Sequence, residues 1–344
     1  MKTILKTFLA TLLLIHLTAQ AQQRVALHSN GVTTIFNTIN PFVDAYNAAL
    51  TGDTIYLSGG AFQPPTTIDK GLTIFGAGFH EDSTAATNLT KITLGFTIGE
   101  NADNLHLEGL FFQATISTLS NTSFNNAHIT RCYFNSSLTI SGNSGNNTDN
   151  LLISETVFNG NVNIENVHNS MITNSIFEGQ LSYTVGNLIQ NNIFLRNGGS
   201  WSSASGRTIY NANSNTFKNN VIFNADMYSI SGTGNTFEKN LFCHSSPELG
   251  LSPISINNYF GVTQSTVFVN QVGYTWVKTN DNHLLDPVTY VGTDNNPVGI
   301  YGGTFPFKAG LIPQNPHIRF KQIAPQTDIN GDLNIQIEVG AQNN

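Results

Sequence analysis

Charged residues are scarce in this sequence. Of its 344 residues only 14 are basic and 21 acidic, so 10% are charged, against about 25% in ordinary soluble proteins. The net charge of −7, with no run rich in lysine and arginine, excludes the basic face that a nucleic-acid binder needs. The same lack argues against attachment to an anionic membrane surface. We therefore expect no nucleic-acid partner.

Long apolar runs are also missing, apart from one near the N-terminus. The stretch from Phe8 to Leu17 follows two lysines and precedes the small-residue motif Ala19-Gln20-Ala21. This is the layout of a secretory signal, and the run is too short to remain as a membrane span. We expect residues 1–21 to be cleaved and the mature chain to be exported, to the periplasm, the cell surface or the medium, with no membrane span.

Asparagine is abundant, with 45 residues, and much of it lies in an internal repeat. Seven segments share one nine-residue frame, and the last residues of successive segments are 17 to 28 positions apart. Such repetition is typical of a solenoid, in which each repeat forms one coil. The segments are NLHLEGLFF (104–112), NAHITRCYF (126–134), NLLISETVF (150–158), NSMITNSIF (169–177), GNLIQNNIF (186–194), SNTFKNNVI (214–222) and GNTFEKNLF (234–242).

The positions of the frame differ in character. The fourth and ninth positions are apolar in all seven segments, whereas the fifth is polar in all seven. This is the alternation of a strand that has one face toward a core and the other toward water. Glycine and asparagine, which accept a positive φ, dominate the sixth position and predict a tight left-handed bend there. Arg131, Glu155 and Lys239 also occupy that position and fit the prediction less well.

The seventh position holds asparagine in the last three segments, at Asn192, Asn220 and Asn240. Stacked on successive coils, these amides could bond to one another, so we predict an interior asparagine ladder.

The repeat as a whole predicts an all-β solenoid of parallel strands, because each repeat contains two short strands, a bend and a variable loop. Cys132 and Cys243 would then lie five coils apart, roughly 24 Å at ~4.8 Å per coil, which is too far for a disulfide. We predict two free thiols.

Both ends of such a solenoid need covers, because open strand edges pair with other chains. At the N-terminal end, Pro41 and the apolar spacing of the following residues predict a short capping helix that stops before Gly52. Near the C-terminus, Asn330-Gly331 lies between two alternating stretches, 317–327 and 333–339, and predicts a β-hairpin. We expect this hairpin to cover an edge or to pack on the solenoid.

These features together resemble the right-handed parallel β-helix of the pectin-lyase-like superfamily. The resemblance covers about residues 31–304, and residues 286–303 are similar to the last coil of secreted β-helix proteins from Bacteroidetes-type bacteria. We divide the chain accordingly into a signal peptide (1–21), a right-handed parallel β-helix domain with its N-terminal cap (22–304), and a linker with the C-terminal hairpin tail (305–344).

The resemblance implies carbohydrate enzymes such as pectate lyases and polygalacturonases, but a fold does not fix an activity. The polygalacturonase signature of closely spaced Asp residues, Gly-His-Gly and Arg-x-Lys does not occur. Hydrolysis needs two grouped acids, and β-elimination needs a base and usually Ca²⁺. The best catalytic candidates are Glu108, Arg131 and Glu155 on adjacent coils, which a surface ion pair explains more simply. We expect no cofactor, with Ca²⁺ required only if the protein is a lyase.

Two further sets of residues are candidates for binding. His106 and His128 share the third position of adjacent coils and could hold a metal, although the column continues as Leu152 and Met171 and supplies no third ligand. Four aromatic residues could stack on sugars or simply pack under loops: Tyr133, Trp201, Tyr210 and Trp276.

The eighth position of the frame is apolar in all seven segments, which is unexpected for an outward-facing column. Strict alternation places it outside, as a long apolar stripe. Three explanations remain: the bend turns the stripe inward, the tail covers it, or a partner or glycan binds to it.

We expect a monomeric, exported, non-catalytic module that binds polysaccharide or a cell-surface protein, because the wall is regular and sets of acids are missing. The main alternative is a divergent polysaccharide lyase or glycoside hydrolase. A structural protein of the cell envelope is the third hypothesis.

Overall fold

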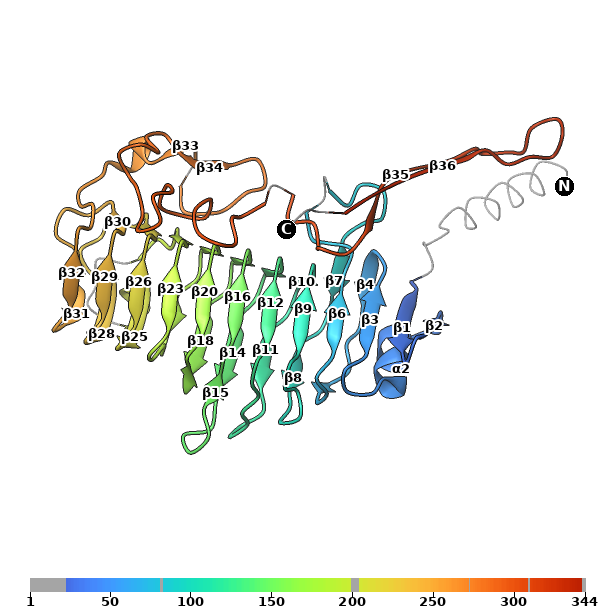
Figure 1. The fold of residues 1–344 in the computed structure, drawn as a ribbon, viewed down its shortest axis with the longest axis horizontal. Helices are drawn as coiled ribbons and strands as arrows, with labels where there is room; N and C mark the ends of the chain where they lie inside the picture. Colours follow the sequence, from blue (N-terminus) through green and yellow to red (C-terminus); the bar gives the residue numbers. More distant parts are fainter. Residues whose placement is uncertain (1–22, 81–82, 199–203, 272, 309, 342–344) are drawn as a thin grey trace, which may run out of the picture.

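The computed structural model describes residues 23–80, 83–198, 204–271, 273–308 and 310–341. The chain forms a solenoid of about 10 turns (Figure 1). The expected signal peptide and Trp201 lie outside the described residues. Within those ranges no helix is both long and apolar enough to cross a membrane.

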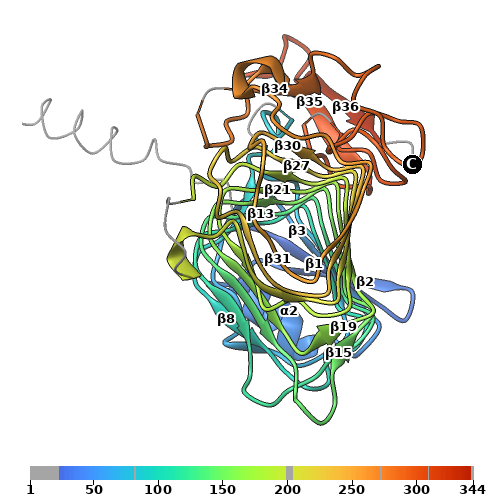
Figure 2. The same ribbon diagram turned by 90° about the vertical axis from the view of Figure 1, so that its left-hand side faces the viewer.

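Three sheets run the length of the solenoid, and Figure 2 shows them end-on as the walls of a tube. The first sheet contains, in spatial order, β2 (Val32–Phe36), β1 (Val25–Ser29), β3 (Thr54–Leu57), β6 (Thr73–Phe75), β9 (His106–Glu108), β12 (His128–Thr130), β16 (Leu152–Ser154), β20 (Met171–Thr173), β23 (Leu188–Gln190), β26 (Thr216–Lys218), β29 (Thr236–Glu238) and β32 (Ile254–Ile256).

The other two sheets contain nine strands each. The second consists of β4 (Gly60–Phe62), β7 (Thr90–Ile92), β10 (Phe111–Phe112), β13 (Tyr133–Phe134), β17 (Val157–Phe158), β21 (Ile176–Phe177), β24 (Ile193–Phe194), β27 (Val221–Ile222) and β30 (Leu241–Phe242). The third consists of β5 (Thr67–Ile68), β8 (Phe96–Ile98), β11 (Ile116–Thr118), β14 (Leu138–Ser141), β18 (Val162–Glu165), β22 (Leu181–Ser182), β25 (Ile209–Asn213), β28 (Ile230–Thr233) and β31 (Leu249–Leu251).

Successive coils pair in parallel, so the predicted parallel β-helix is confirmed. The apolar fourth and ninth positions face the interior, as expected, and are buried in all seven repeats. Their rings stack along the axis: Phe134, Phe158, Phe177 and Phe194 follow one another at 4.9–5.0 Å between centroids. The expectation that the fifth position faces water is wrong for Glu108, Ser154 and Thr173, which are buried under another part of the chain.

The predicted left-handed bends are confirmed at every sixth position, where φ lies between 48° and 70°. Arg131 (φ 52°), Glu155 (φ 49°) and Lys239 (φ 56°) adopt this conformation too, although it costs a residue with a Cβ about 1–2 kcal/mol. The first position of each repeat also has a positive φ. Residues 252–260 form an eighth repeat that the sequence pattern did not reveal, because Ser255 occupies its inward position.

Stacked asparagines occupy the seventh position in the C-terminal half of the solenoid. Asn192 Nδ2 donates to Asn220 Oδ1 (3.0 Å), and Asn220 Nδ2 donates to Asn240 Oδ1 (2.9 Å). Asn240 Nδ2 donates in turn to Asn258 Oδ1 (3.0 Å) in the eighth repeat. A second stack that sequence reasoning missed lies at the second position, where Asn215 Nδ2 donates to Asn235 Oδ1 (3.1 Å).

The N-terminal end of the solenoid is covered by α2 (Pro41–Ala48), the predicted capping helix, which is the one α-helix of the described residues. Pro41 opens this helix, and Phe42, Ala45 and Tyr46 are buried against the first coils. The strand β1 pairs antiparallel with both β2 and β3, so the first sheet begins with an antiparallel pair.

The described residues between 261 and 316, called here the return segment, run back along the outside of the solenoid toward its N-terminal end (Figures 1 and 2). They include a 3₁₀ turn, η2 (Gln264–Thr266), and the pair β33 (Phe268–Asn270) and β34 (Asp281–Leu284). Another 3₁₀ turn, η1 (Ala204–Gly206), and the small pair β15 (Thr148–Asp149) and β19 (Val167–His168) lie in loops of the solenoid. Residues 286–303, expected as a last coil, belong to the return segment instead.

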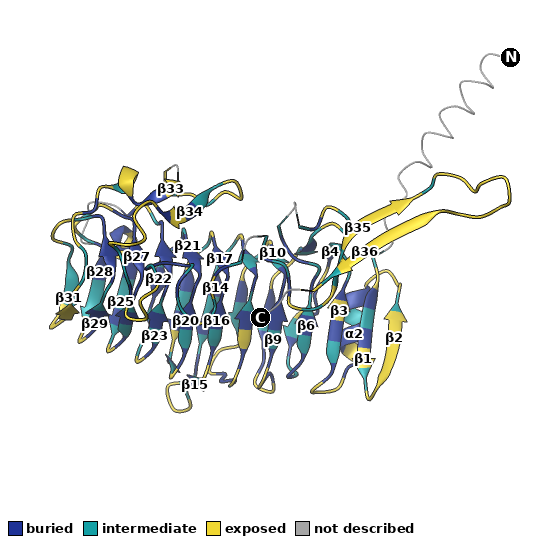
Figure 3. Ribbon diagram, turned by 45° about the horizontal axis from the view of Figure 1, so that its top comes forward, coloured by how far each residue is buried: buried dark blue, intermediate teal, exposed yellow. Residues whose placement is uncertain are grey.

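The return segment covers the apolar stripe at the eighth position. Its apolar side chains pack on the five stripe residues from Val157 to Leu241, all of which are fully buried (Figure 3). Of the three explanations for this stripe, covering by another part of the chain is correct, but the expected tail (305–344) supplies only Phe307 and Leu311 of the cover. The rest comes from residues 262–300, which were expected to belong to the β-helix domain. The covering residues are Val262, Val267, Phe268, Leu284, Val298, Ile300, Phe307 and Leu311.

The C-terminal hairpin, β35 (His317–Ile323) and β36 (Ile335–Gly340), is confirmed. The expectation that it covers an edge or packs on the solenoid is wrong, because its two strands pair only with each other, carry no buried residue and project past the N-terminal end of the solenoid (Figure 1). The two free thiols are confirmed as well: Cys132 and Cys243 are unpaired and buried, and burial raises the pKa of each thiol to about 12.

Asn220→Ala removes the middle of the asparagine stack and takes away the bonds that its side chain makes to the backbone N–H of Asn192 and the carbonyl of Ile189 on the preceding coil. We expect it to lower the free energy of unfolding by about 2–4 kcal/mol, since each unsatisfied buried polar group costs about 1–3 kcal/mol. Denaturant unfolding measures the loss. The control Asn47→Ala, exposed on α2, should change stability by less than about 0.5 kcal/mol. Equal effects of the two substitutions would contradict a structural role for the stack.

Candidate functional site

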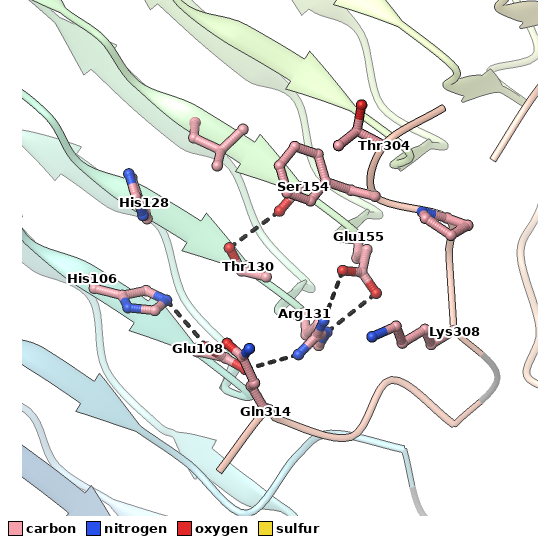
Figure 4. Close-up of a pocket in the computed structure, with 13 residues that line it drawn as sticks. His106, Glu108, His128, Thr130, Arg131, Ser154, Glu155, Thr304, Lys308 and Gln314 are labelled. Atoms are coloured by element: carbon pink, nitrogen blue, oxygen red, sulfur yellow. Dashed lines mark hydrogen bonds and ion pairs between the residues drawn. The ribbon is translucent and has the colours of Figure 1, made fainter. Parts of the chain in front are cut away.

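A cleft of about 530 Å³ lies between the outer face of the first sheet and the return segment (Figure 4). Its floor comes from β9, β12 and β16 and from the bends that follow them, and its roof comes from Thr304, Phe305, Pro306, Lys308 and Gln314. The volume is within the range of sites for small molecules and ligand segments. The lining residues are His106, Glu108, His128, Thr130, Arg131, Leu152, Ser154, Glu155, Thr304, Phe305, Pro306, Lys308 and Gln314.

The coil stacking brings all three catalytic candidates together at one end of the cleft. Arg131 donates from Nε and Nη2 to both carboxylate oxygens of Glu155 (3.1 and 3.0 Å), and from Nη1 to Glu108 Oε1 (3.1 Å). The side chains of Arg131, Glu108 and Glu155 are only 7%, 1% and 2% exposed. The expected surface ion pair is therefore a buried triad, because the return segment lies over it.

The triad also fixes the return segment to the solenoid. The backbone N–H of Gln314 donates to Glu108 Oε1, the same oxygen that Arg131 binds. Nearby, Pro313 packs so closely on Gly109 that a Cβ there would lie 2.2 Å from the proline ring. A glycine at this bend is thus required by the approach of the return segment as well as by its φ of 70°.

Glu108 is held in its ionised form. Burial, the largest influence, raises the pKa of its carboxyl, but bonds from His106 and the Gln314 N–H and the charge of Arg131 together lower this pKa below its usual value. A glycosidase acid needs the opposite, a carboxyl kept protonated near neutral pH. All three nitrogens of the Arg131 guanidinium bond to the two carboxylates, so the triad is suited to structure rather than to proton transfer.

His106 and His128 form the polar centre of the floor. Their rings meet edge to face at 5.6 Å between centroids, and His106 Nε2 lies 3.2 Å from Glu108 Oε2. Burial and the neighbouring His106 lower the pKa of His128, so its ring is neutral at physiological pH. Across the described ranges no three His, Cys, Asp or Glu side chains are grouped to hold a metal. Beside the histidines, the hydroxyl groups of Thr130 and Ser154 form a hydrogen bond of 3.2 Å.

The row of rings continues beyond the cleft toward the N-terminal end. Phe75 contacts His106 at 5.6 Å and Tyr56 stacks on Phe75 at 5.5 Å. A second pocket of about 350 Å³ lies there, lined by Tyr56 and Phe75 on one side and by Pro316, His317 and Lys321 on the other. Sequence reasoning missed both rings because they precede the seven repeats, although their strands continue the same sheet.

The roof of the cleft is positioned by side chains from the left-handed bends. Asn174 Nδ2 donates to the carbonyls of Ile300 (2.8 Å) and Gly302 (2.6 Å), and Asn219 Oδ1 accepts from the N–H of Thr293 (2.9 Å). These contacts fix residues 293–302 on the bends, so the chain reaches the cleft at Thr304 in a defined place.

The four aromatic candidates do not meet in one place. Tyr133 and Trp276 lie together on the second sheet, 6.1 Å apart, where both contact Phe79. Tyr210 lies on the third sheet against Tyr183, and Trp201 lies outside the described residues. None of the other three, Tyr133, Tyr210 and Trp276, lines the cleft of Figure 4.

Glu178 lies beneath the return segment near Tyr133 and Trp276. Burial raises the pKa of its carboxyl to about 7, although the backbone N–H of Trp276 lowers it in part. Its Oε1 atom is buried without a hydrogen-bond partner. The carboxyl therefore opposes docking of the return segment when it is ionised and favours docking when it is protonated.

Comparison with known proteins assigns no function to the chain, so the function has to be inferred from the geometry of the site. No family model matches the sequence, and neither a curated protein nor a solved structure matches the chain significantly.

Arg131→Ala leaves two buried carboxylates without their cation. We expect a loss of about 3–5 kcal/mol in the free energy of unfolding, the usual effect of breaking a buried pair on one side. The control Lys218→Ala breaks the more exposed pair with Glu238 (3.0 Å) and should cost about 0–1 kcal/mol. Chemical denaturation of both variants measures these free energies of unfolding. A decrease for Arg131→Ala as small as that of the control would show that the triad is not structural.

Glu178→Gln should remove a pH dependence of stability. Because folding raises the pKa of Glu178 from 4.5 to about 7, its contribution is complete below pH 4.5 and disappears as the pH rises through 7. The wild type should therefore lose stability relative to Glu178→Gln as the pH rises from 4.5 to about 7, with little further change above that interval. Thermal unfolding across this interval measures the difference, and parallel curves for the two proteins would contradict the prediction.

Proposed function

We propose that this protein is a non-catalytic module that binds a segment of a polysaccharide chain in the cleft of Figure 4. The observation that carries the proposal is a sizeable cleft whose acidic side chains are already occupied by Arg131, while its imidazoles and hydroxyls line the surface. Such a site offers many hydrogen-bonding groups to a ligand and lacks a pair of free acids.

The chemistry of the lining suits a sugar chain. Hydroxyl groups of a sugar both donate and accept, and Thr130 and the neutral His128 can do the same. The apolar faces of sugar rings find partners in Phe305 and Pro306 on the roof and in Phe75 and Tyr56 along the floor. The row of rings formed by Tyr56, Phe75, His106 and His128 runs along the solenoid axis. An extended sugar chain would lie in the same direction.

The wider assignment follows from the same features. We infer membership of the pectin-lyase-like superfamily from the parallel three-sheet solenoid with its capping helix. Export is inferred from the basic, apolar and small-residue pattern of residues 1–21, and an extracellular polysaccharide would then be accessible to the protein. The bacterial group named above stays a prediction. The proposed binding needs no cofactor.

One observation favours a second candidate, a divergent polysaccharide lyase. His128 is neutral and lies in the cleft, and a neutral imidazole can take the proton that β-elimination releases. Ca²⁺ would be the metal in that case. Incubation of the protein with polysaccharides, with and without Ca²⁺, followed by ultraviolet absorbance of unsaturated ends, separates turnover from binding.

His128→Ala tests the binding proposal. We expect retention on a glycan array for the wild type, without new reducing or unsaturated ends, and an affinity about tenfold weaker in the variant, a loss of about 1.4 kcal/mol. The matched control is His28→Ala, an exposed histidine on β1 of the same sheet but outside the cleft. Binding that is unchanged in His128→Ala, or lost equally in the control, would refute the cleft as the site.

A further inference from the structure

The two edges of the first sheet are unprotected. Within the described part of the chain no strand pairs with the outer edge of β2 at the N-terminal end or of β32 at the other end. Neither strand carries a charged residue, and Ile35 and Ile254 are 55% and 56% exposed. Natural proteins usually blunt such edges with charges, because an open edge pairs with another chain.

The directions of the two edge strands match. The strand β1 is antiparallel to β3, and β2 is antiparallel to β1, so β2 runs in the same direction as every coil strand of the first sheet. A second copy placed behind the first along the solenoid axis would bring its β2 beside β32 in parallel. The joint would therefore have the same strand direction as the pairs between coils.

The side-chain alternation matches as well. In β32, Ser255 is the partner of the inward Phe237 on β29 and therefore also faces inward, while Ile254 and Ile256 face outward. In β2, Thr34 lies opposite the buried Leu27, so Thr34 faces inward and Ile35 faces outward. Parallel pairing of the two strands places inward hydroxyls beside each other and outward isoleucines beside each other.

A second surface at the N-terminal end fits the same partner. The hairpin β35–β36 projects past this end on the side of the return segment (Figures 1 and 3). Its apolar residues Ile323, Ile337 and Val339 are at least half exposed. At the opposite end, Leu285 and Val288 of the neighbouring return segment are exposed, as is Phe260 at the end of the eighth repeat. In an axial arrangement the overhanging hairpin of one copy reaches this apolar region of the next.

We propose that the protein associates with itself head to tail, with β2 and the hairpin of one copy docked on β32 and the return segment of the next. The interface is heterologous, so each copy keeps one free end of each kind and the assembly grows as a linear filament. This replaces the earlier expectation of a monomer. The proposal is independent of the glycan-binding cleft.

Sedimentation velocity and negative-stain electron microscopy of the purified protein over a range of concentrations test the proposal. The wild type should show species of about two or more times the monomer mass that lengthen along one axis. Ile35→Lys and Ile254→Lys place a charge on one edge each and should be monomeric on their own. Leu119→Lys, an exposed apolar position away from both ends, should assemble as the wild type does.

A mixture of the two edge variants gives the sharpest result. Ile35→Lys keeps an intact β32 edge and Ile254→Lys keeps an intact β2 edge, so together they should form a dimer and nothing larger. Circular dichroism and thermal unfolding first establish that each variant is folded. A wild type that stays monomeric, edge variants that still form filaments, or a mixture without dimers would each overturn the proposal. Loss of assembly in Leu119→Lys would do the same, because it would indicate non-specific association.

Discussion

The left-handed bend at the sixth position of each coil is the constraint on which the rest of the structure depends. It shifts the alternation of the strand, so that the seventh and ninth positions face the interior and the eighth faces outward. An apolar eighth position therefore creates an outer stripe that must be covered. The return segment supplies the cover, and the asparagines of the same bends bind its backbone through Asn174 and Asn219. The roof of the cleft is a consequence of this docking.

The cleft lies where the bend column departs from its own rule. Most bends contain Gly or Asn, but two adjacent ones contain Arg131 and Glu155, which adopt the left-handed conformation at a cost. Both side chains then project on the same line as Asn174 and Asn191, toward the return segment. With Glu108 they form a charged triad that takes the place of the asparagine contacts and binds Gln314. Departures of this kind from local conformational preference are expected at functional or strained sites.

Much of the fold was predictable from the sequence, because each coil repeats one local pattern. The inward columns, the bends, the capping helix and the hairpin all follow from residue type at fixed positions. The path of the return segment was not predictable, since its Gly- and Asn-rich residues 286–303 resemble a coil and only tertiary contacts place them outside. For the site, coil stacking predicted that Glu108, Arg131 and Glu155 meet. Their burial was missed, because it depends on Gln314, which lies 206 residues from Glu108 along the chain.

The interior of the solenoid changes character at a single coil, and this change explains the position of the site. In the N-terminal half, the second and seventh positions are apolar or small, such as Leu105, Leu110 and Cys132, and the coils are held together mainly by packing. From Asn187 and Asn192 to Asn235 and Asn240 both positions are asparagine, and each of these residues except Asn235 bonds to the asparagine of the next coil.

Ser170 and Ser175 form the transition between these halves. Each hydroxyl accepts an N–H from the preceding coil, and each backbone N–H donates to an asparagine of the following one. The directional bonds of the amides fix the register of the C-terminal half without help from outside. In the N-terminal half the packing of apolar groups is less directional, so the charged triad and the return segment supply the fixed points there. A rigid cleft is consequently formed on the half of the solenoid that the return segment holds in place.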